Sequence, residues 1–465
     1  MRYLLVFVTT LLAAFPGGYI FAQNINTPEN FPDPNFREAV EEFMGVGPGG
    51  EFSADQAAMR DGWFECAERE IKDMSGLEFF TGITYLSCYA NAVTSLNVSN
   101  CNSLIGLFCS GNLLTSLDVS NNTVLTVLSC GANQLSNLDV SKNTALVELL
   151  CSANHLTDLD LSENRTLREL ECSWNQLSRL EMSNNSDLEM LWCWDNKLTK
   201  LGVSKNTVLT RLSCQNNLLT GLDLSNNMAL AELNCDNNQL TALDLSNNIA
   251  LARLFCGNNL LTSLDVSSNI ALESLSCDLN QLTSLDVSKN VGLTFLSCSH
   301  NRLMNLDVCN NSVLEALVCG YNQLSTLDLS DNPALTELDC WHNQLTALDV
   351  SSNSNLQLLW CHNNQLTNLD SLVANKGLGE GDAVDVRYNL LDCDDWPDVQ
   401  ILKSRLGEPL FGGYEGAFAG FAYSPQKGLD PYDCAAVSDW ALFEGHFTEG
   451  GLSELPKAPL PSSPQ

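Results

Sequence analysis

The stretch Leu-Thr-Glu-Leu-Asp-Cys-Trp-His-Asn-Gln-Leu-Thr-Ala-Leu-Asp-Val-Ser-Ser-Asn-Ser-Asn, residues 335–355, is one period of the repeat that decides the fold. Its cysteine recurs every 21 residues without a gap, from Cys88 to Cys361. An asparagine follows each of these cysteines by three residues, from Asn91 to Asn364. A period this regular is typical of a solenoid, in which each coil packs only on its neighbours.

Each period has two halves that repeat one pattern. Cys340 corresponds to Val350, and Asn343 corresponds to Asn353. Apolar and polar residues alternate in both halves, which predicts a short extended segment in each. We therefore expect a mainly β solenoid with short parallel strands on both sides of every coil. The two asparagine columns should point inward at the corners, satisfy backbone groups and donate to the next asparagine along the stack.

This pattern resembles the leucine-rich repeat superfamily, and most closely its nested bacterial class with a 21-residue period, sometimes called IRREKO. The resemblance covers about residues 64–370, where a Leu-x-x-Leu-x-Cys-x-x-Asn half alternates with a Leu-Asp-Val half. Residues 31–80 resemble the helical cap of internalin-like proteins. The resemblance implies a right-handed coil, a strand face used for binding, and no catalysis.

The chain divides into five predicted segments. Arg2 followed by an apolar run and small residues up to Ala22 indicates a signal peptide over residues 1–22; a membrane anchor is the weaker interpretation because the apolar core is too short. A helical N-terminal cap (23–63) should begin a helix at Pro34 and another after Ser53. The solenoid (64–370), a C-terminal cap (371–406) with a short helix at 397–405, and an irregular Gly/Pro-rich tail (407–465) follow.

Charge limits the partners. The chain has 22 Lys and Arg against 56 Asp and Glu, a formal net charge of −34. Such a surface repels phosphate backbones and anionic lipids, so we expect no nucleic-acid partner and no membrane insertion. The signal peptide predicts a protein that is secreted or held at the cell surface, and we expect a monomer.

The 19 cysteines admit more than one interpretation in an exported protein. Neighbouring ladder cysteines would lie about one strand spacing, ~4.8 Å, apart with parallel side chains, which makes disulfide geometry hard. We expect buried free thiols, and no zinc spacing is present. Neither a cofactor nor a metal is expected. Cys393 and Cys434 lie off the ladder, and a bridge between them stays open.

Candidate binding residues occupy the outward positions of the cysteine half, namely three and one residues before the cysteine and one and two after it. The valine half of the array carries no Trp, Tyr or Phe. Exposed aromatic residues on one face favour an interaction surface for protein or sugar rings. The competing interpretation is that the rings stack on one another and stiffen the face. The candidates are Phe108, Trp174, Trp192, Trp194, Phe255, Tyr321, Trp341, His342, Trp360 and His362.

The valine half carries a column of aspartates from Asp118 to Asp370, interrupted by Glu181 and Gly202. A row of carboxylates could bridge calcium, but a solvated face that protects the strand backbone is the simpler interpretation. No catalytic motif is present, so we expect no enzyme. The sequence favours an exported bacterial module that binds a protein or a glycan; the alternative is a structural or adhesive spacer at the cell surface.

Overall fold

The computed structural model describes residues 23–407, 410–411 and 418–423, so the predicted signal peptide and Cys434 lie outside the described residues. The chain forms two compact units: the first ends at Gly292, and the second begins at Leu293. Each unit is described by itself. Within the described residues, no helix is long and apolar enough to cross a membrane.

The first unit begins with a helical cap, as the sequence predicts. Helix α1 (Pro34–Met44) starts after Asp33, whose side chain accepts hydrogen bonds from two backbone N–H groups, and it ends at Gly45 with φ 71°. Helix α2 (Ala54–Met59) begins with a capping box between Ser53 and Gln56. The short 3₁₀ helix η1 (Leu77–Phe79) follows strand β1 (Gly62–Glu65).

An aromatic core joins this cap to the first coil. The Phe43 and Phe64 rings stack with centroids 4.5 Å apart, and Phe64 lies 5.5 Å from Phe80. Phe31 and Phe36, also buried, contact the same group of rings. The cap therefore covers the apolar end that an unpaired first coil would expose.

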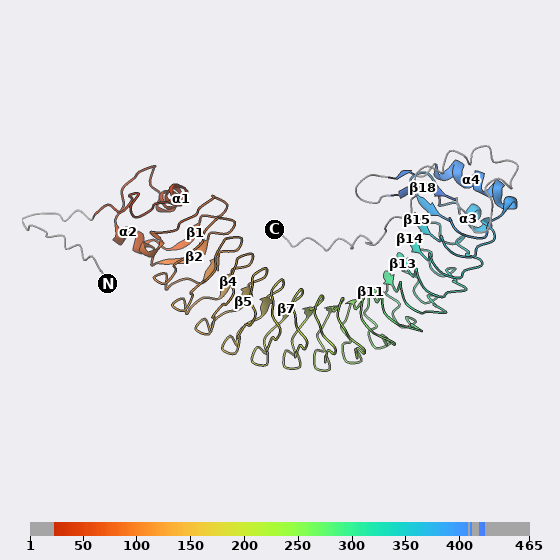
Figure 1. The fold of residues 1–465 in the computed structure, drawn as a ribbon, viewed down its shortest axis with the longest axis horizontal. Coiled ribbons are helices and arrows are strands. Elements are labelled where there is room, and N and C mark those ends of the chain that lie inside the picture. The colour runs from red at the N-terminus through yellow and green to blue at the C-terminus, as the bar shows by residue number, and fades with distance from the viewer. Residues whose placement is uncertain (1–22, 408–409, 412–417, 424–465) are drawn as a thin grey trace, which may run out of the picture. The chain divides into compact units, whose positions relative to one another are not determined.

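Parallel strands form a ladder along one side of the coils in the first unit (Figure 1). Neighbouring strands pair in register, so that Leu254 lies between Leu233 and Leu275. The strands are β1 (Gly62–Glu65), β2 (Ile83–Ser87), β3 (Gly106–Phe108), β4 (Val127–Ser129), β5 (Glu148–Leu150), β6 (Glu169–Glu171), β7 (Met190–Trp192), β8 (Arg211–Ser213), β9 (Glu232–Asn234), β10 (Arg253–Phe255) and β11 (Ser274–Ser276).

The second unit consists of further coils of the same kind, followed by a C-terminal cap. Four strands precede its cap: β12 (Phe295–Ser297), β13 (Ala316–Val318), β14 (Glu337–Asp339) and β15 (Leu358–Trp360). Its C-terminal part contains α3 (Asp370–Ala374), β16 (Ala383–Asp385), η2 (Cys393–Asp395), α4 (Trp396–Leu406), β17 (Leu410–Phe411) and β18 (Phe418–Ala422). Strand β16 pairs with both β15 and β18 in parallel, so the ladder runs past residue 370 and takes a strand from the segment that the sequence led us to expect as irregular.

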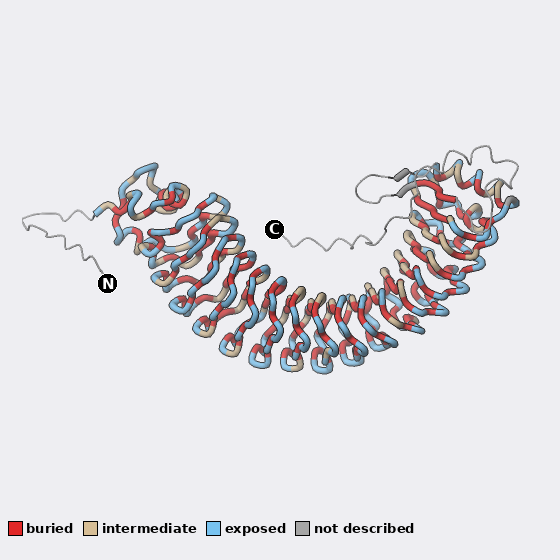
Figure 2. The backbone as a smooth tube through the Cα atoms, viewed as in Figure 1, coloured by how far each residue is buried: buried red, intermediate tan, exposed pale blue. Residues whose placement is uncertain are grey.

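Buried and exposed residues alternate along the coils (Figure 2). In the coil of β10, Leu254 and Cys256 are fully buried, whereas Phe255 between them is only half-buried. The ladder cysteines from Cys88 to Cys361 are all buried, and none of them forms a disulfide bond. This confirms that the cysteine is a small inward apolar residue rather than a surface thiol.

The two asparagine columns bind backbone rather than each other's side chains. Asn259 donates from Nδ2 to the carbonyls of Cys235 (3.0 Å) and Cys256 (3.2 Å), and its Oδ1 accepts from the N–H of Leu240. In the second column, Asn248 donates to the carbonyl of Asn227, one coil earlier, at 2.8 Å. Each asparagine thus fixes the corner of its own coil and links it to the preceding one.

The second row of strands is shorter than expected. Across the described residues, the valine side shows only isolated bridges, between Asn97 and Asp118 and among Glu181, Gly202 and Asp223. The reason is local: an aspartate such as Asp244 accepts the N–H of the residue two positions later (Ser246), which bends the chain. Tight turns follow at once and leave no room for a three-residue strand.

Thiol reactivity provides a test of the inward cysteines. Burial raises the pKa of the Cys130 thiol to about 12, and it raises the pKa of the Cys109 and Cys340 thiols as well. Among the 17 cysteines with described side chains, 16 are buried and Cys309 is exposed. A thiol reagent should therefore label Cys309 in the native protein and the 16 others only after unfolding, as mass spectrometry of labelled peptides would show. Rapid native labelling of Cys256 or Cys277 would contradict this packing.

Candidate functional site

The outward positions of the cysteine half form the cysteine-strand face, defined as the residues three and one before each ladder cysteine and one and two after it. On β7, Met190 and Trp192 are half-buried while Leu191 between them is fully buried. The alternation of side chains along a strand sends every second residue outward. All ten candidate residues occupy this face, as their spacing predicts, and each is half-buried or exposed.

Rings gather at two places on this face in the first unit. Trp63 stacks on Tyr85 (centroids 5.2 Å apart) and on Phe108 (5.5 Å). A side chain at Gly106 would collide with the Tyr85 ring, so the glycine leaves the space that this ring occupies. Farther along, Trp174 and Trp194 meet edge to face at 5.5 Å.

The second unit holds the larger group, which we name the His-aromatic cluster: His300, Tyr321, Trp341, His342 and His362. Tyr321 stacks between His300 and His342, with both centroid distances 4.2 Å. Trp341 contacts Tyr321 edge to face at 4.4 Å and stacks on His362 at 4.8 Å. Gly320 again makes room, because a Cβ there would lie 2.6 Å from the Trp341 ring.

The remaining candidates stand apart from these groups. Trp192 has Glu171 and Ser213 as its strand neighbours, and Trp360 lies between Asp339 and Asp385. Phe255 lies between Asn234 and Ser276. These three rings are flanked by polar side chains, so each presents an apolar surface with hydrogen-bonding groups beside it.

Contacts between rings account for part of this clustering, but they leave some of the rings largely exposed to solvent. Trp174 is 57% exposed and Trp63 is 51% exposed, although both touch other rings. The sequence analysis missed Trp63 because it precedes the first ladder cysteine. The available signal was its position three residues before Cys66, which matches an outward position of the later coils.

Several of these rings occupy an unfavourable backbone conformation. The residue two after each ladder cysteine has positive φ, and this position holds glycine at Gly111 and asparagine at Asn237. Trp174 (φ 53°), Tyr321 (49°) and His342 (49°) adopt the same left-handed conformation. Bulky residues there cost of order 1 kcal/mol each relative to glycine or asparagine, so the backbone alone does not favour these rings.

Charged groups border the His-aromatic cluster. Arg387 donates to both carboxylate oxygens of Asp385, at 2.9 and 2.6 Å. His362 Nδ1 lies 3.4 Å from Asp385 Oδ2. Burial nevertheless lowers the pKa of His362 to about 4, because its desolvation outweighs the attraction of a carboxylate already neutralised by Arg387. His362 is therefore a neutral ring at physiological pH.

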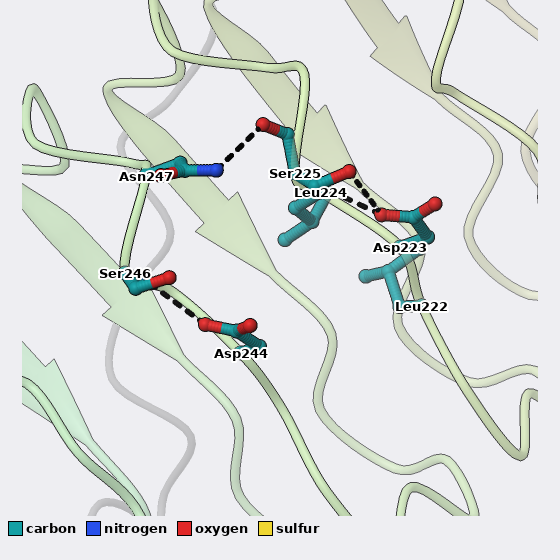
Figure 3. A pocket seen from close by; sticks show the side chains of 7 residues that line it. All are labelled: Leu222, Asp223, Leu224, Ser225, Asp244, Ser246 and Asn247. Atoms are coloured by element: carbon teal, nitrogen blue, oxygen red, sulfur yellow. Dashed lines mark hydrogen bonds between the residues drawn. The ribbon is translucent and has the colours of Figure 1, made fainter.

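The opposite, valine side has a different surface. A hollow lies between two coils there, lined by Leu222, Asp223, Leu224, Ser225, Asp244, Ser246 and Asn247 (Figure 3). The side chain and N–H of Ser225 both bond Asp223 Oδ1, at 2.7 and 3.1 Å, and Asn247 donates to the Ser225 carbonyl. These carboxylates cap turns. In the part of the chain that the structure describes, no three His, Cys, Asp or Glu side chains are grouped to hold a metal ion.

Comparison with known proteins places this coil among leucine-rich repeats. The family model of leucine-rich repeats in two copies matches residues 333–374. The functional domain of InlJ from Listeria monocytogenes, whose structure includes a cysteine ladder, is 36% identical with a TM-score of 0.74, covering 79% of this chain and 83% of that one. No curated protein sequence matches the chain.

Two more distant structures share the fold. A leucine-rich repeat protein of Leptospira interrogans is 23% identical (TM-score 0.65), covering 72% of this chain and 92% of its own. The internalin InlF of Listeria monocytogenes is 22% identical (TM-score 0.60), with 79% and 99% coverage. At these identities the likeness concerns the coil alone.

Proposed function

This chain belongs to the leucine-rich repeat proteins, and from that premise we propose that it is an exported, non-catalytic binding module whose cysteine-strand face recognises a protein or a glycan. A leucine-rich repeat coil of the internalin type is a scaffold typical of protein-binding modules. The observation that carries the proposal is that the aromatic rings of the coils lie on this face. In the first unit they include Trp174, Trp192 and Trp194. In the second unit they include the His-aromatic cluster and Trp360.

The physical basis is the kind of surface that these rings offer. Aromatic side chains bury a large area with few rotatable bonds, and they dominate binding energy where polar groups surround them. Trp192 next to Glu171, and Trp360 next to Asp385, have this composition. A spacer would need no rings at left-handed corners, where glycine or asparagine is less strained.

The first experiment identifies the ligand class. The purified mature chain is applied to a glycan array and, in parallel, used to capture proteins that are then identified by mass spectrometry and confirmed with purified components. A saturable ligand in either assay supports the proposal and fixes its class. A chain that binds neither a glycan nor a purified protein would favour the spacer.

Substitution of two rings then tests the face. Trp192→Ala and Trp360→Ala should each weaken the binding of a confirmed ligand by about 1–3 kcal/mol, roughly 5- to 150-fold in Kd, because both rings occupy outward positions of their strands. The melting temperature should stay close to that of the unsubstituted chain. Isothermal titration calorimetry and thermal melting measure the two effects separately.

The matched controls lie on the valine side. Asp265→Asn and Asp286→Asn retain the oxygen that accepts the N–H of Ser267 or Ser288, so the turns should persist. Neither change should alter affinity by more than about twofold. Loss of binding in the aspartate variants, with the Trp192 and Trp360 variants unaffected, would show that the ligand uses the other face.

A further inference from the structure

A stripe of exposed apolar residues crosses four successive coils of the first unit, away from the cysteine-strand face. Met228, Ile249, Ile270 and Val291, here named the apolar stripe, are 60%, 56%, 65% and 58% exposed. Each directly follows a buried asparagine of the second column, and the next residue on each coil is an exposed alanine or glycine. The same position on the five preceding coils holds Thr123, Thr144, Arg165, Ser186 and Thr207. The stripe is therefore a local feature and not a requirement of the repeat.

Hydrogen bonds hold the stripe residues in a row. The N–H of Asn227 bonds the Leu224 carbonyl (3.0 Å), and the N–H of Leu230 bonds the Asn227 carbonyl (3.1 Å), so Met228 lies at the outside of a tight corner. Asn248 and Asn269 each donate to the asparagine carbonyl one coil earlier, at 2.8 and 2.9 Å. Adjacent corners are thus fixed at one coil spacing, and their apolar side chains form a continuous, preorganised surface.

A row of carboxylates accompanies the stripe. The Leu224–Asn227 turn separates Asp223 from Met228, and the same arrangement recurs on the next coils with Asp244, Asp265 and Asp286. Hydrogen bonds from the serine two residues later lower the pKa of each of these carboxyls. These four aspartates are ionised at neutral pH, so a negative row lies one turn before the stripe in each coil. Lys289 adds a positive charge near Asp286 on the last of these coils.

The apolar stripe and the carboxylate row together indicate which kind of partner could bind here. A second copy of the chain would bring a like-charged row against the first, in a protein whose net charge is −34. An anionic lipid surface would be repelled for the same reason. A partner with an apolar strip and a basic border satisfies both features, because its Lys and Arg side chains would meet carboxylates that are already held in place.

We propose that the apolar stripe docks a basic amphipathic helix of a partner protein, laid across the four coils. The coils repeat at about 4.8 Å where their cysteine-side strands pair, which is close to the 5.4 Å pitch of an α-helix. Apolar residues on successive helical turns can therefore meet successive stripe residues. Four coils span about 14 Å, the length of roughly ten helical residues. The helix would occupy this surface independently of any ligand on the cysteine-strand face.

The test uses a fluorescein-labelled 14-residue Leu/Lys amphipathic helical peptide, with a Leu/Glu peptide of the same apolar pattern and a scrambled Leu/Lys peptide as comparisons. Fluorescence anisotropy with the whole chain should show binding of the ordered Leu/Lys peptide at least tenfold tighter than of the other two. Ile249→Thr with Ile270→Thr, which places the residue of the Thr144 and Thr207 corners on the stripe, should weaken binding at least fivefold. Val124→Thr, at an exposed apolar position outside the stripe, should leave it unchanged.

Each of these comparisons has an outcome that would contradict the proposal. Equal affinity of the ordered and scrambled Leu/Lys peptides, or of the Ile249/Ile270 double variant and the unsubstituted chain, would reduce the interaction to nonspecific charge attraction. Tighter binding of the Leu/Glu peptide would contradict the role of the carboxylate row. Sedimentation velocity decides the remaining case, because a dimer that dissociates in the double variant would make a second copy the occupant. Circular dichroism establishes that the double variant is folded.

Discussion

Replacing Leu254 with Asp should remove a cooperative block of coils from the native structure. Leu254 is fully buried on β10 and lies between Leu233 and Leu275 of the adjacent strands. The change loses the burial of a leucine, which is worth about 2–5 kcal/mol, and places an uncompensated carboxylate in the core at a further cost of about 3–5 kcal/mol. Because each coil packs on its neighbours, the loss of structure should extend to the coils on either side.

Hydrogen exchange read by mass spectrometry would locate the effect. Peptides from β9 to β11 should exchange rapidly in Leu254→Asp, while peptides from the N-terminal cap keep their protection. Thr262→Asp is the matched control, since Thr262 is exposed on the same coil and a charge there stays in water. Unchanged protection around β10 in the Leu254 variant would show that this side chain does not lie in the core.

Replacing Asp236 with Asn should stabilise the protein, and only above mildly acidic pH. Asp236 follows Cys235 on the cysteine-strand face, where burial raises the pKa of its carboxyl to about 7; a bond from the Gly257 N–H opposes that shift, and the charge of Asp278 adds to it. The unfolded chain has a carboxyl pKa near 3.9. The folded state therefore holds the proton more strongly, and this contribution to stability is present below about pH 4 and is lost as the pH rises to about 7.

The asparagine variant does not titrate at this position, so the difference in folding stability between the two proteins should grow as the pH rises. A shift of about three pKa units corresponds to ~4 kcal/mol, and partial solvent contact of Asp236 reduces the expected gain to about 2 kcal/mol at pH 8. Thermal melting at pH 4 and pH 8 should show nearly equal midpoints at the lower pH and a higher midpoint for Asp236→Asn at the upper one.

Asp223→Asn provides a control, because the pKa of Asp223 is shifted in the opposite direction to that of Asp236. Hydrogen bonds from the Ser225 side chain and N–H lower the pKa of Asp223, so its ionised form supports the folded state above the unfolded pKa and loses that role as the pH falls. This variant should gain no stability at pH 8. A rise in its midpoint equal to that of Asp236→Asn would mean that net charge, and not burial of Asp236, causes the effect.

The sequence predicts the coil because its strongest signals are periodic and its core is repetitive. The inward Cys256 and Leu254, the corner Asn259 and the start of α1 at Pro34 all follow from spacing and capping preferences. The extent of valine-side pairing does not follow from periodicity, since turns formed by residues such as Asp244 and Ser246 decide how long the chain stays extended. Periodicity equally gave no indication that Phe418–Ala422 would join the ladder through β16.

The candidate site was predictable in position but not in arrangement. Outward placement of Trp192, Trp341 and Trp360 follows from strand alternation. The contacts among rings depend on features that spacing does not encode, such as the gap at Gly320 that admits the Trp341 ring. The low pKa of His362 likewise depends on its burial beside the Asp385–Arg387 pair, which comes from a strand outside the regular cysteine ladder.

The asparagine columns restrict how such a chain can change in length. Asn259 bonds its own coil and the one before it, and Asn248 bonds the carbonyl of Asn227 exactly one period earlier in sequence. Inserting or deleting a few residues within a coil would displace the asparagines, the cysteine and the leucines from their partners together. Gain or loss of a whole coil leaves every such bond with an equivalent partner. Duplication and deletion of complete 21-residue segments are therefore the length changes that the fold accepts, and the reach of the binding face can vary by whole coils while its chemistry is altered one outward residue at a time.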